Sequence, residues 1–162
     1  MTKRIIGIDP GLVHTGWAII EAAGNQRKYI ASGVILPKTS APLPERLLAI
    51  FDGLQKIAAE FGPTEAAIEI TFVSKNPMTS LLLGHARGTA IAALGKAGLR
   101  VAEYDPTKIK KAVVGTGRGD KDQVAKMVSL LMPGAKPKTS DEADAIAIAL
   151  THANTSDILT RC

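Results

Sequence analysis

The sequence has little cysteine, few aromatic residues and no long apolar run. Its single cysteine, Cys162, has no second cysteine with which to form an intramolecular disulfide, so we expect a reducing, cytoplasmic location. One Trp, two Tyr and three Phe leave Leu, Ile, Val and Ala to build most of the core. The apolar run after the basic N-terminal residues meets Asp9 almost at once, so we expect neither a signal peptide nor a membrane span.

The length of 162 residues predicts a single domain, 1–162, that can bury most of its apolar surface without disulfides. We expect the last few residues to be disordered. The net charge of +5 is typical of proteins that bind nucleic acid, although basic proteins also bind acidic partners. Much of the positive charge falls in one short stretch, at Lys108, Lys110, Lys111, Arg118, Lys121 and Lys126. On composition alone, a solvated helix face explains this stretch equally well.

The apolar periodicity and the turn residues predict the order βββαβαβαα, followed by a terminal helix. The expected strands are 4–9, 14–21, 29–36, 65–70 and 100–104. The first expected helix begins at Pro44, and the later ones span 80–96, 107–113, 121–132 and 141 to about 153. Short connections between the first three strands indicate an antiparallel meander, and βα units follow it. This is the order of an α/β, ribonuclease H-like fold with a five-stranded mixed sheet flanked by helices.

Four acidic residues occupy positions from which their carboxylates could reach one common site. Asp9 ends the first apolar strand, where Pro10 fixes the backbone, and Glu69 ends another strand. Asp141 and Asp144 lie three residues apart at the start of the last helix, so their side chains share one face. Acids in a first helical turn are commonly only dipole partners. A shared site is favoured because a strand-end Asp, a strand-end Glu and an acidic helix start occur together in one chain, in that order.

Crowded carboxylates repel one another unless cations neutralise them, and hard oxygen ligands select Mg²⁺ or Mn²⁺. Two such ions, roughly 3.5–4 Å apart, cleave phosphodiesters, because one lowers the pKa of the attacking water and the other stabilises the leaving oxygen. Such a pair takes about four carboxylates, which is the number found here. The rigid position of Asp9 suits the carboxylate that bridges both ions.

Five stretches of the chain, in order and at matching spacing, resemble the RuvC family of Holliday-junction resolvases. They are Gly7-Ile8-Asp9-Pro10-Gly11 with Thr15-Gly16, Ala67-Ile68-Glu69 with Phe72, Leu83-Gly84 with Ala86-Arg87-Gly88, Val113-Val114-Gly115 with Lys121-x-Gln123-Val124, and Asp141-x-Ala143-Asp144-Ala145 with Thr151-His152. The likeness runs over nearly the whole chain. Leu12-Val13-His14 and Trp17-Ala18 depart from the family pattern, and neither departure touches the carboxylates.

The resemblance implies a role for each of these residues. It makes Asp9, Glu69, Asp141 and Asp144 the catalytic ligands of two Mg²⁺ ions per active site, with Mn²⁺ able to substitute. It adds Lys121 to the catalytic residues, and it makes Phe72 an aromatic that stacks on an unpaired base. The implied DNA-binding residues are Phe72, Lys75, Arg87, Lys108, Lys110, Lys111, Arg118 and Lys121. No histidine is needed as a metal ligand.

The resemblance also implies the function. It indicates a homodimeric, Mg²⁺-dependent endonuclease that resolves four-way DNA junctions by paired symmetric nicks in recombination and repair. The helix 80–96 is the expected dimer element, and a branch-migration complex of junction-binding and motor subunits is the expected partner.

Two rival functions come from other classes of protein. An ATP-binding module of the actin and sugar-kinase type would need a second glycine-rich phosphate motif and about twice this length. The intact carboxylates argue against a junction-binding protein without nuclease activity, whereas a related nuclease acting on RNA is not distinguished by any residue of the sequence.

Overall fold

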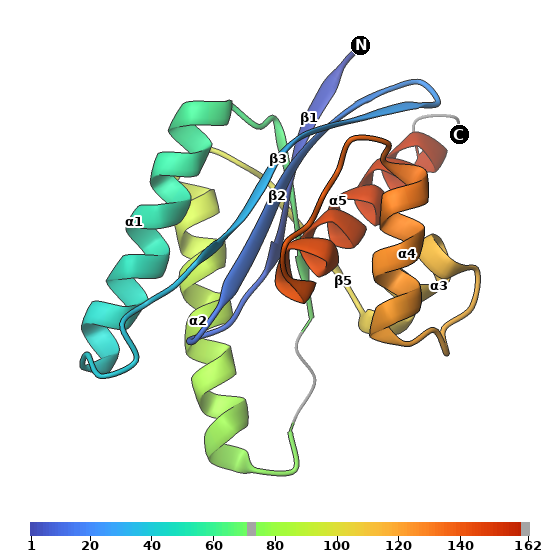
Figure 1. Cartoon of the computed structure of the whole chain (residues 1–162). Helices are drawn as coiled ribbons and strands as arrows, with labels where there is room; N and C mark the ends of the chain where they lie inside the picture. The colour runs from blue at the N-terminus through green and yellow to red at the C-terminus, as the bar shows by residue number, and fades with distance from the viewer. Residues whose placement is uncertain (71–73, 160–162) are drawn as a thin grey trace.

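The computed structural model describes residues 1–70 and 74–159, with a five-stranded mixed sheet at its centre (Figure 1). The strands are β1 (Lys3–Asp9), β2 (Thr15–Ala23), β3 (Gln26–Ile35), β4 (Glu65–Glu69) and β5 (Val101–Tyr104). They lie in the order β3-β2-β1-β4-β5, with β1, β2 and β3 antiparallel and β1, β4 and β5 parallel. The predicted α/β class, with a meander followed by βα units, is confirmed. Phe72 and the last residues, 160–162, lie outside the described residues.

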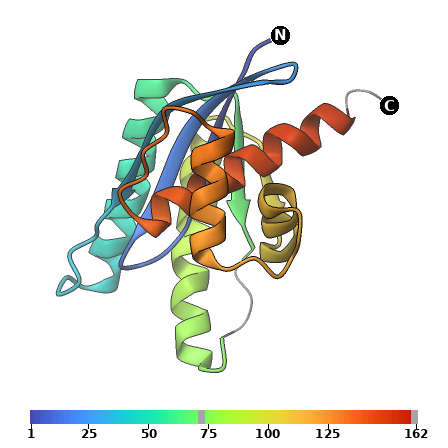
Figure 2. The ribbon, with the colours of Figure 1, turned by 45° about the vertical axis from the view of Figure 1, so that its right-hand side comes forward.

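Helices cover both faces of the sheet. One face carries α1 (Leu43–Phe61) and α2 (Pro77–Lys96), and the other carries α5 (Ser140–Leu159). The shorter helices α3 (Pro106–Val114) and α4 (Lys121–Leu131) pack against α5, as Figure 2 shows. Among the described residues, no helix is both long and apolar enough to cross a bilayer.

Strand β1 lies between two apolar cores. Ile5 belongs to the core beneath α5, whereas Ile6 and Ile8 belong to the core beneath α1 and α2. Successive side chains of a strand point to opposite faces, so a strand buried on both sides must be apolar throughout. This explains the continuous apolar run that precedes Asp9 and places the carboxylate directly after the buried residues 5–8 of the strand.

Several helix boundaries differ from those predicted. Helix α2 begins at Pro77 instead of residue 80, because the Asn76 side chain accepts hydrogen bonds from the backbone N–H groups of Met78 and Thr79, at 2.9 and 3.4 Å. Helix α5 runs to Leu159, beyond the predicted end near residue 153. Helix α4 begins with a capping box, in which the Asp120 side chain accepts from the Gln123 backbone N–H at 2.8 Å and the Gln123 side chain accepts from the Asp120 backbone N–H at 3.0 Å.

Helix α5 approaches β1 and β2 unusually closely, at two glycines. A Cβ atom built on Gly7 would lie 2.3 Å from the carbonyl oxygen of Ala145, and one on Gly16 would lie 2.3 Å from that of Asp141. Only glycine permits backbone contacts of this kind. These two positions bring the start of α5, with Asp141 and Asp144, down onto the sheet.

We predict that Gly7→Ala lowers the free energy of unfolding, by roughly 1–3 kcal/mol as for other overpacked sites. The added methyl would meet backbone atoms of Ala145 and Ala149, which cannot rotate away. Urea unfolding monitored by circular dichroism measures the change. Gly95→Ala is the matched control, because a Cβ there meets nothing within 4 Å and should cause no loss of stability. Equal effects of the two substitutions would contradict the close approach.

Candidate active site

The sheet and helix α5 bring the four predicted acids to one edge of the molecule. Asp9 and Glu69 end the neighbouring parallel strands β1 and β4, one residue beyond the pair formed by Ile8 and Ile68. Asp9 also pairs with Gly16 of β2. A Cβ atom built on Gly16 would lie 2.3 Å from the carbonyl oxygen of Asp141, so the backbone of α5 lies directly against this residue. The start of α5 therefore lies over the ends of β1 and β2, and Asp144 follows one helical turn later.

A pocket of about 250 Å³ lies at this edge. The carboxylates of Asp9, Glu69 and Asp144 line it together with two lysines, Lys110 and Lys121. Asp141 does not line the pocket. Its carboxylate lies 3.8 Å from Nδ1 of the exposed His14. The structure thus places three of the four predicted acids around one cavity and the fourth nearby.

The carboxylates of this pocket are close enough to repel one another. Burial is the largest cause that raises the pKa of Asp9 from its ordinary 3.8 to about 8, and repulsion by Asp144, Glu69 and Asp141 adds to it. Burial and repulsion by Asp144 also raise the pKa of Glu69. The pKa of Asp144 is raised mainly by burial, while Lys121 opposes the rise. The pocket therefore disfavours three simultaneous negative charges even beside its lysines, and Asp9 keeps its proton up to about pH 8.

The two lysines reach the pocket from the short helices α3 and α4. Lys121 is the first residue of α4, and its Nζ lies 4.0 Å from Oδ2 of Asp144 while 77% of the side chain stays exposed. Lys110 lies on α3, whose start is fixed by the Asp105 side chain accepting a hydrogen bond from the Lys108 backbone N–H at 2.8 Å. Both positive charges thus face the carboxylates across a cavity open to solvent.

The other basic residues predicted to bind DNA do not line this pocket. Arg87 of α2 forms an ion pair with Glu103 of β5. Lys108 places its Nζ 5.0 Å from the centroid of the Tyr104 ring. Lys75, Lys111 and Arg118 are exposed on the surface. Their role in DNA binding stays a prediction, as does that of Phe72.

Sequence reasoning missed the contribution of Glu142. This side chain is buried, and its Oε2 accepts hydrogen bonds from the Ser32 hydroxyl at 2.9 Å and the Lys138 backbone N–H at 3.3 Å. It thereby attaches the first turn of α5 to β3 and to the loop before the helix. The signal was available, because Glu142 precedes the buried Ile146 by one turn and so shares its inward face.

The donor set of the pocket fits a hard divalent cation. Among the described residues, no group of three or more His, Cys, Asp or Glu side chains is already spaced as a finished metal cluster. The pocket nevertheless offers only carboxylate oxygens as anionic donors, partly buried and mutually repelling. A divalent cation would remove that repulsion and let Asp9, Glu69 and Asp144 approach one another.

Comparison with known proteins identifies the family. The chain matches the family described as crossover junction endodeoxyribonuclease RuvC over residues 5–152. The chain belongs to the RuvC family. The resemblance noted in the sequence is thereby confirmed, and the RuvC family is one of metal-dependent nucleases.

Individual RuvC proteins are similar to this chain along nearly its whole length. The RuvC proteins of Azorhizobium caulinodans and Rhodopseudomonas palustris are each 52% identical to it over 151 residues, which are 93% of this chain and 89% and 87% of theirs. A structure of Thermus thermophilus RuvC in complex with a Holliday junction substrate superposes with a TM-score of 0.89 at 31% identity. The superposition covers 98% of this chain and 97% of that one.

The yeast mitochondrial Holliday junction resolvase shares the fold at much lower sequence identity. It superposes with a TM-score of 0.72 at 13% identity, covering 98% of this chain and 81% of that one. With the RuvC structures, it confirms the predicted ribonuclease H-like fold.

We predict that the metal-free protein loses stability as the pH rises from about 4 to 8. The folded protein holds the Asp9 proton up to about pH 8, whereas the unfolded chain releases it near 3.8. Stability from this group is therefore complete below pH 3.8 and is lost as the pH approaches 8. Thermal unfolding of chelator-treated protein at pH 5 and pH 8 tests this, with Asp9→Asn as the comparison. The wild type should lose more stability than Asp9→Asn between the two pH values, and parallel curves would contradict the raised pKa.

Proposed function

We propose that this protein is a Mg²⁺-dependent endonuclease that resolves four-way DNA junctions in recombination and repair. The observation that carries the proposal is the pocket in which Asp9, Glu69 and Asp144 face Lys110 and Lys121. The comparisons support the proposal. This chain belongs to the RuvC family, and it is similar over nearly its full length to a RuvC whose structure was solved with a Holliday junction substrate. A cytoplasmic location remains a prediction from the sequence.

The carboxylates would hold two Mg²⁺ ions, or Mn²⁺ in their place. Asp9, at the end of β1 and the most buried of these acids, would be the central ligand, and Glu69, Asp144 and Asp141 would complete the set. When bound, the ions supply the activation of water and the stabilisation of the leaving 3′ oxygen. The strand-end backbone of Asp9 and Glu69 keeps these carboxylates oriented before metal enters.

Lys110 and Lys121 would hold the scissile phosphate against the carboxylates. An ammonium group binds phosphate as a point charge, and at 77% exposure Lys121 can reach a strand that enters from solvent. We assign the exposed Lys75, Lys108, Lys111 and Arg118, with Arg87, to DNA outside the pocket, and by resemblance to the family we assign Phe72 to an unpaired base of the junction. These contacts would position the junction and add affinity that falls with salt.

A four-way junction has twofold symmetry, so a twofold dimer would present one active site to each of two like strands. Helix α2 is the proposed dimer element. Its support is that Met78 and Leu81, large apolar side chains on α2, are 61% and 55% exposed. A branch-migration complex of junction-binding and motor subunits is the proposed partner, by resemblance to the family.

Cleavage of a cruciform plasmid and of a labelled four-way junction tests the proposal. Wild-type protein with Mg²⁺ should linearise the plasmid, because paired nicks in one complex require two active sites. Asp9→Asn keeps the shape of the side chain but removes the bridging charge, so nicking should fall by at least about 10³-fold while junction binding is retained. Linear duplex of the same sequence is the matched substrate control.

Each other outcome has a distinct meaning. Binding of the junction without cleavage under any divalent metal would support a recognition protein without nuclease activity. Preferential cleavage of a four-way RNA would support a related ribonuclease. Nicked circles without linear plasmid would contradict the proposed dimer but would still support a nuclease.

We predict that Lys121→Ala lowers kcat for junction cleavage by roughly 10²–10³-fold, as the loss of one charge-stabilising donor does elsewhere. Single-turnover cleavage with saturating protein measures it, and Lys121→Arg should recover part of the rate. Lys111→Ala is the control, because Lys111 is exposed on α3 but does not line the pocket. It should weaken binding slightly without changing the single-turnover rate. Equal losses from the two alanine variants would reduce Lys121 to a general DNA contact.

A further inference from the structure

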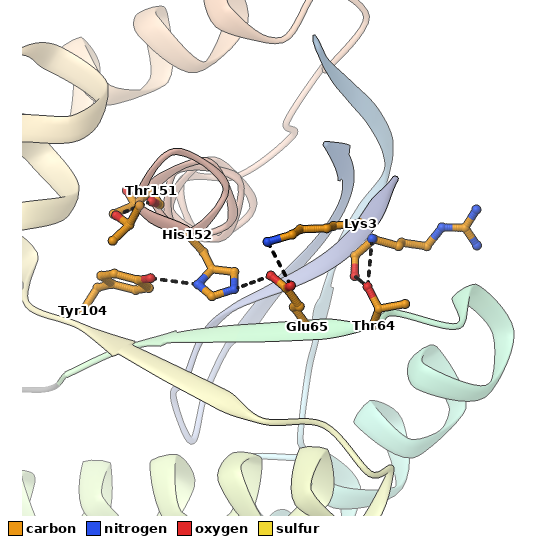
Figure 3. A network of polar contacts seen from close by, with 8 residues as sticks. Lys3, Thr64, Glu65, Tyr104, Thr151 and His152 are labelled. Carbon is orange, nitrogen blue, oxygen red and sulfur yellow. Dashed lines mark hydrogen bonds and ion pairs between the residues drawn. The ribbon is translucent and has the colours of Figure 1, made fainter. Parts of the chain in front are cut away.

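Away from the pocket, a buried polar chain joins α5 to the sheet, as Figure 3 shows. His152 of α5 is only 9% exposed, and its ring lies between Tyr104 and Glu65. The Nδ1 atom lies 2.8 Å from the Tyr104 hydroxyl, and Nε2 lies 2.9 Å from Oε2 of Glu65. Lys3 completes the chain with its Nζ 3.2 Å from Oε1 of Glu65. One helical side chain is thus tied to strands β5, β4 and β1.

The protonation states of this chain follow from its partners. Burial lowers the pKa of His152, so its imidazole is neutral near pH 7. The carboxylate of Glu65 can only accept, so Nε2–H donates to it and Nδ1 accepts from the Tyr104 hydroxyl. Burial raises the pKa of Tyr104, which keeps its hydroxyl protonated as the donor. Both ring nitrogens of His152 are therefore satisfied.

Near Gly7 the helix α5 meets the sheet through its backbone and two small side chains, Ala145 and Ala149. The larger Ile146 and Ile148 of the helix are buried in the apolar core on the same side of the sheet, and apolar contacts of this kind are non-directional. Hydrogen bonds, by contrast, weaken steeply with distance and angle. The two bonds of His152 to neighbouring strands therefore add a second directional anchor, about three helical turns after that of Glu142, and resist displacement of α5 along its axis.

We propose that His152, held by Tyr104 and Glu65, is a positioning residue that sets the axial register of α5 and so places Asp141 and Asp144 at the metal site. The inference rests on the proposed role of those two acids. Asp144 precedes His152 by eight residues, about 12 Å along a helix, and a helix transmits an axial slip along its length. A misplacement of about 1 Å in an active site can cost 10²-fold in rate. None of the four residues Lys3, Glu65, Tyr104 and His152 lines the pocket, so none touches the reacting groups.

Binding of Mn²⁺ in the absence of DNA, followed by electron paramagnetic resonance, tests this directly. His152→Leu removes both hydrogen bonds and should weaken Mn²⁺ binding by about 10–100-fold, as losses of supporting contacts do at other metal sites. The half-saturating Mg²⁺ concentration for junction cleavage should rise similarly, while junction affinity without metal stays unchanged. His152→Gln, whose amide can still donate to Glu65, should recover part of the affinity.

Two further variants separate positioning from stability. Tyr104→Phe removes one oxygen and keeps the ring, so it supplies the measurement if His152→Leu does not fold, and it should shift metal binding in the same direction. Glu21→Gln weakens the ion pair of Glu21 with Arg4, which joins β1 and β2 without involving α5. This control should lower the melting temperature with no change in Mn²⁺ affinity.

The outcomes separate this inference from the proposed function. Wild-type Mn²⁺ affinity in both His152→Leu and Tyr104→Phe, with only the melting temperature lowered, would overturn the positioning role. If the wild type itself binds no Mn²⁺, or if Asp9→Asn cleaves normally, the proposed metal site fails first and the inference fails with it.

Discussion

The close contact between α5 and the first two strands is the constraint on which the rest of the structure depends. At Gly7 and Gly16 the helix backbone rests on the sheet backbone, with no side chain between them. Residues from the end of the chain thereby reach the end of its first strand. A bulkier side chain at either glycine would lift the helix and separate Asp141 and Asp144 from Asp9 and Glu69. The candidate site therefore depends on the absence of a side chain at Gly7 and at Gly16.

Electrostatics opposes the arrangement that packing imposes. The pocket holds partly buried carboxylates whose pKa values are raised by burial and by one another, and Lys121 offsets this only in part. The apolar cores on both sides of β1 supply the stability that keeps the charges together. A protein organised in this way is under strain as an apoprotein and gains stability from cations. The directional bonds of Glu142 and His152 then resist displacement of α5 by that repulsion.

Much of this could be predicted from the sequence, because periodicity and turn residues are local. The order of elements, the mixed sheet and the four acids all followed from them. The start of α2 was misplaced because the cap made by Asn76 was not recognised. The partners of Glu142 and His152 could not be predicted, since Ser32 and Glu65 lie about a hundred positions away from them in the chain. Pairing across such separations depends on the fold itself and leaves no pattern in a single sequence.

The arrangement of the parallel strands bears on when the site comes into existence. Asp9 and Glu69 become neighbours only when β4 pairs beside β1, and the remaining acids arrive only with α5, the last helix of the chain. Such long-range pairings form late in folding, and ribosomes release the N-terminal segments first. A nascent chain that still lacks α5 has half of its carboxylates. Synthesis itself thus delays the assembly of the candidate site until the protein is nearly complete, because an unfinished copy lacks the helix that carries Asp141 and Asp144.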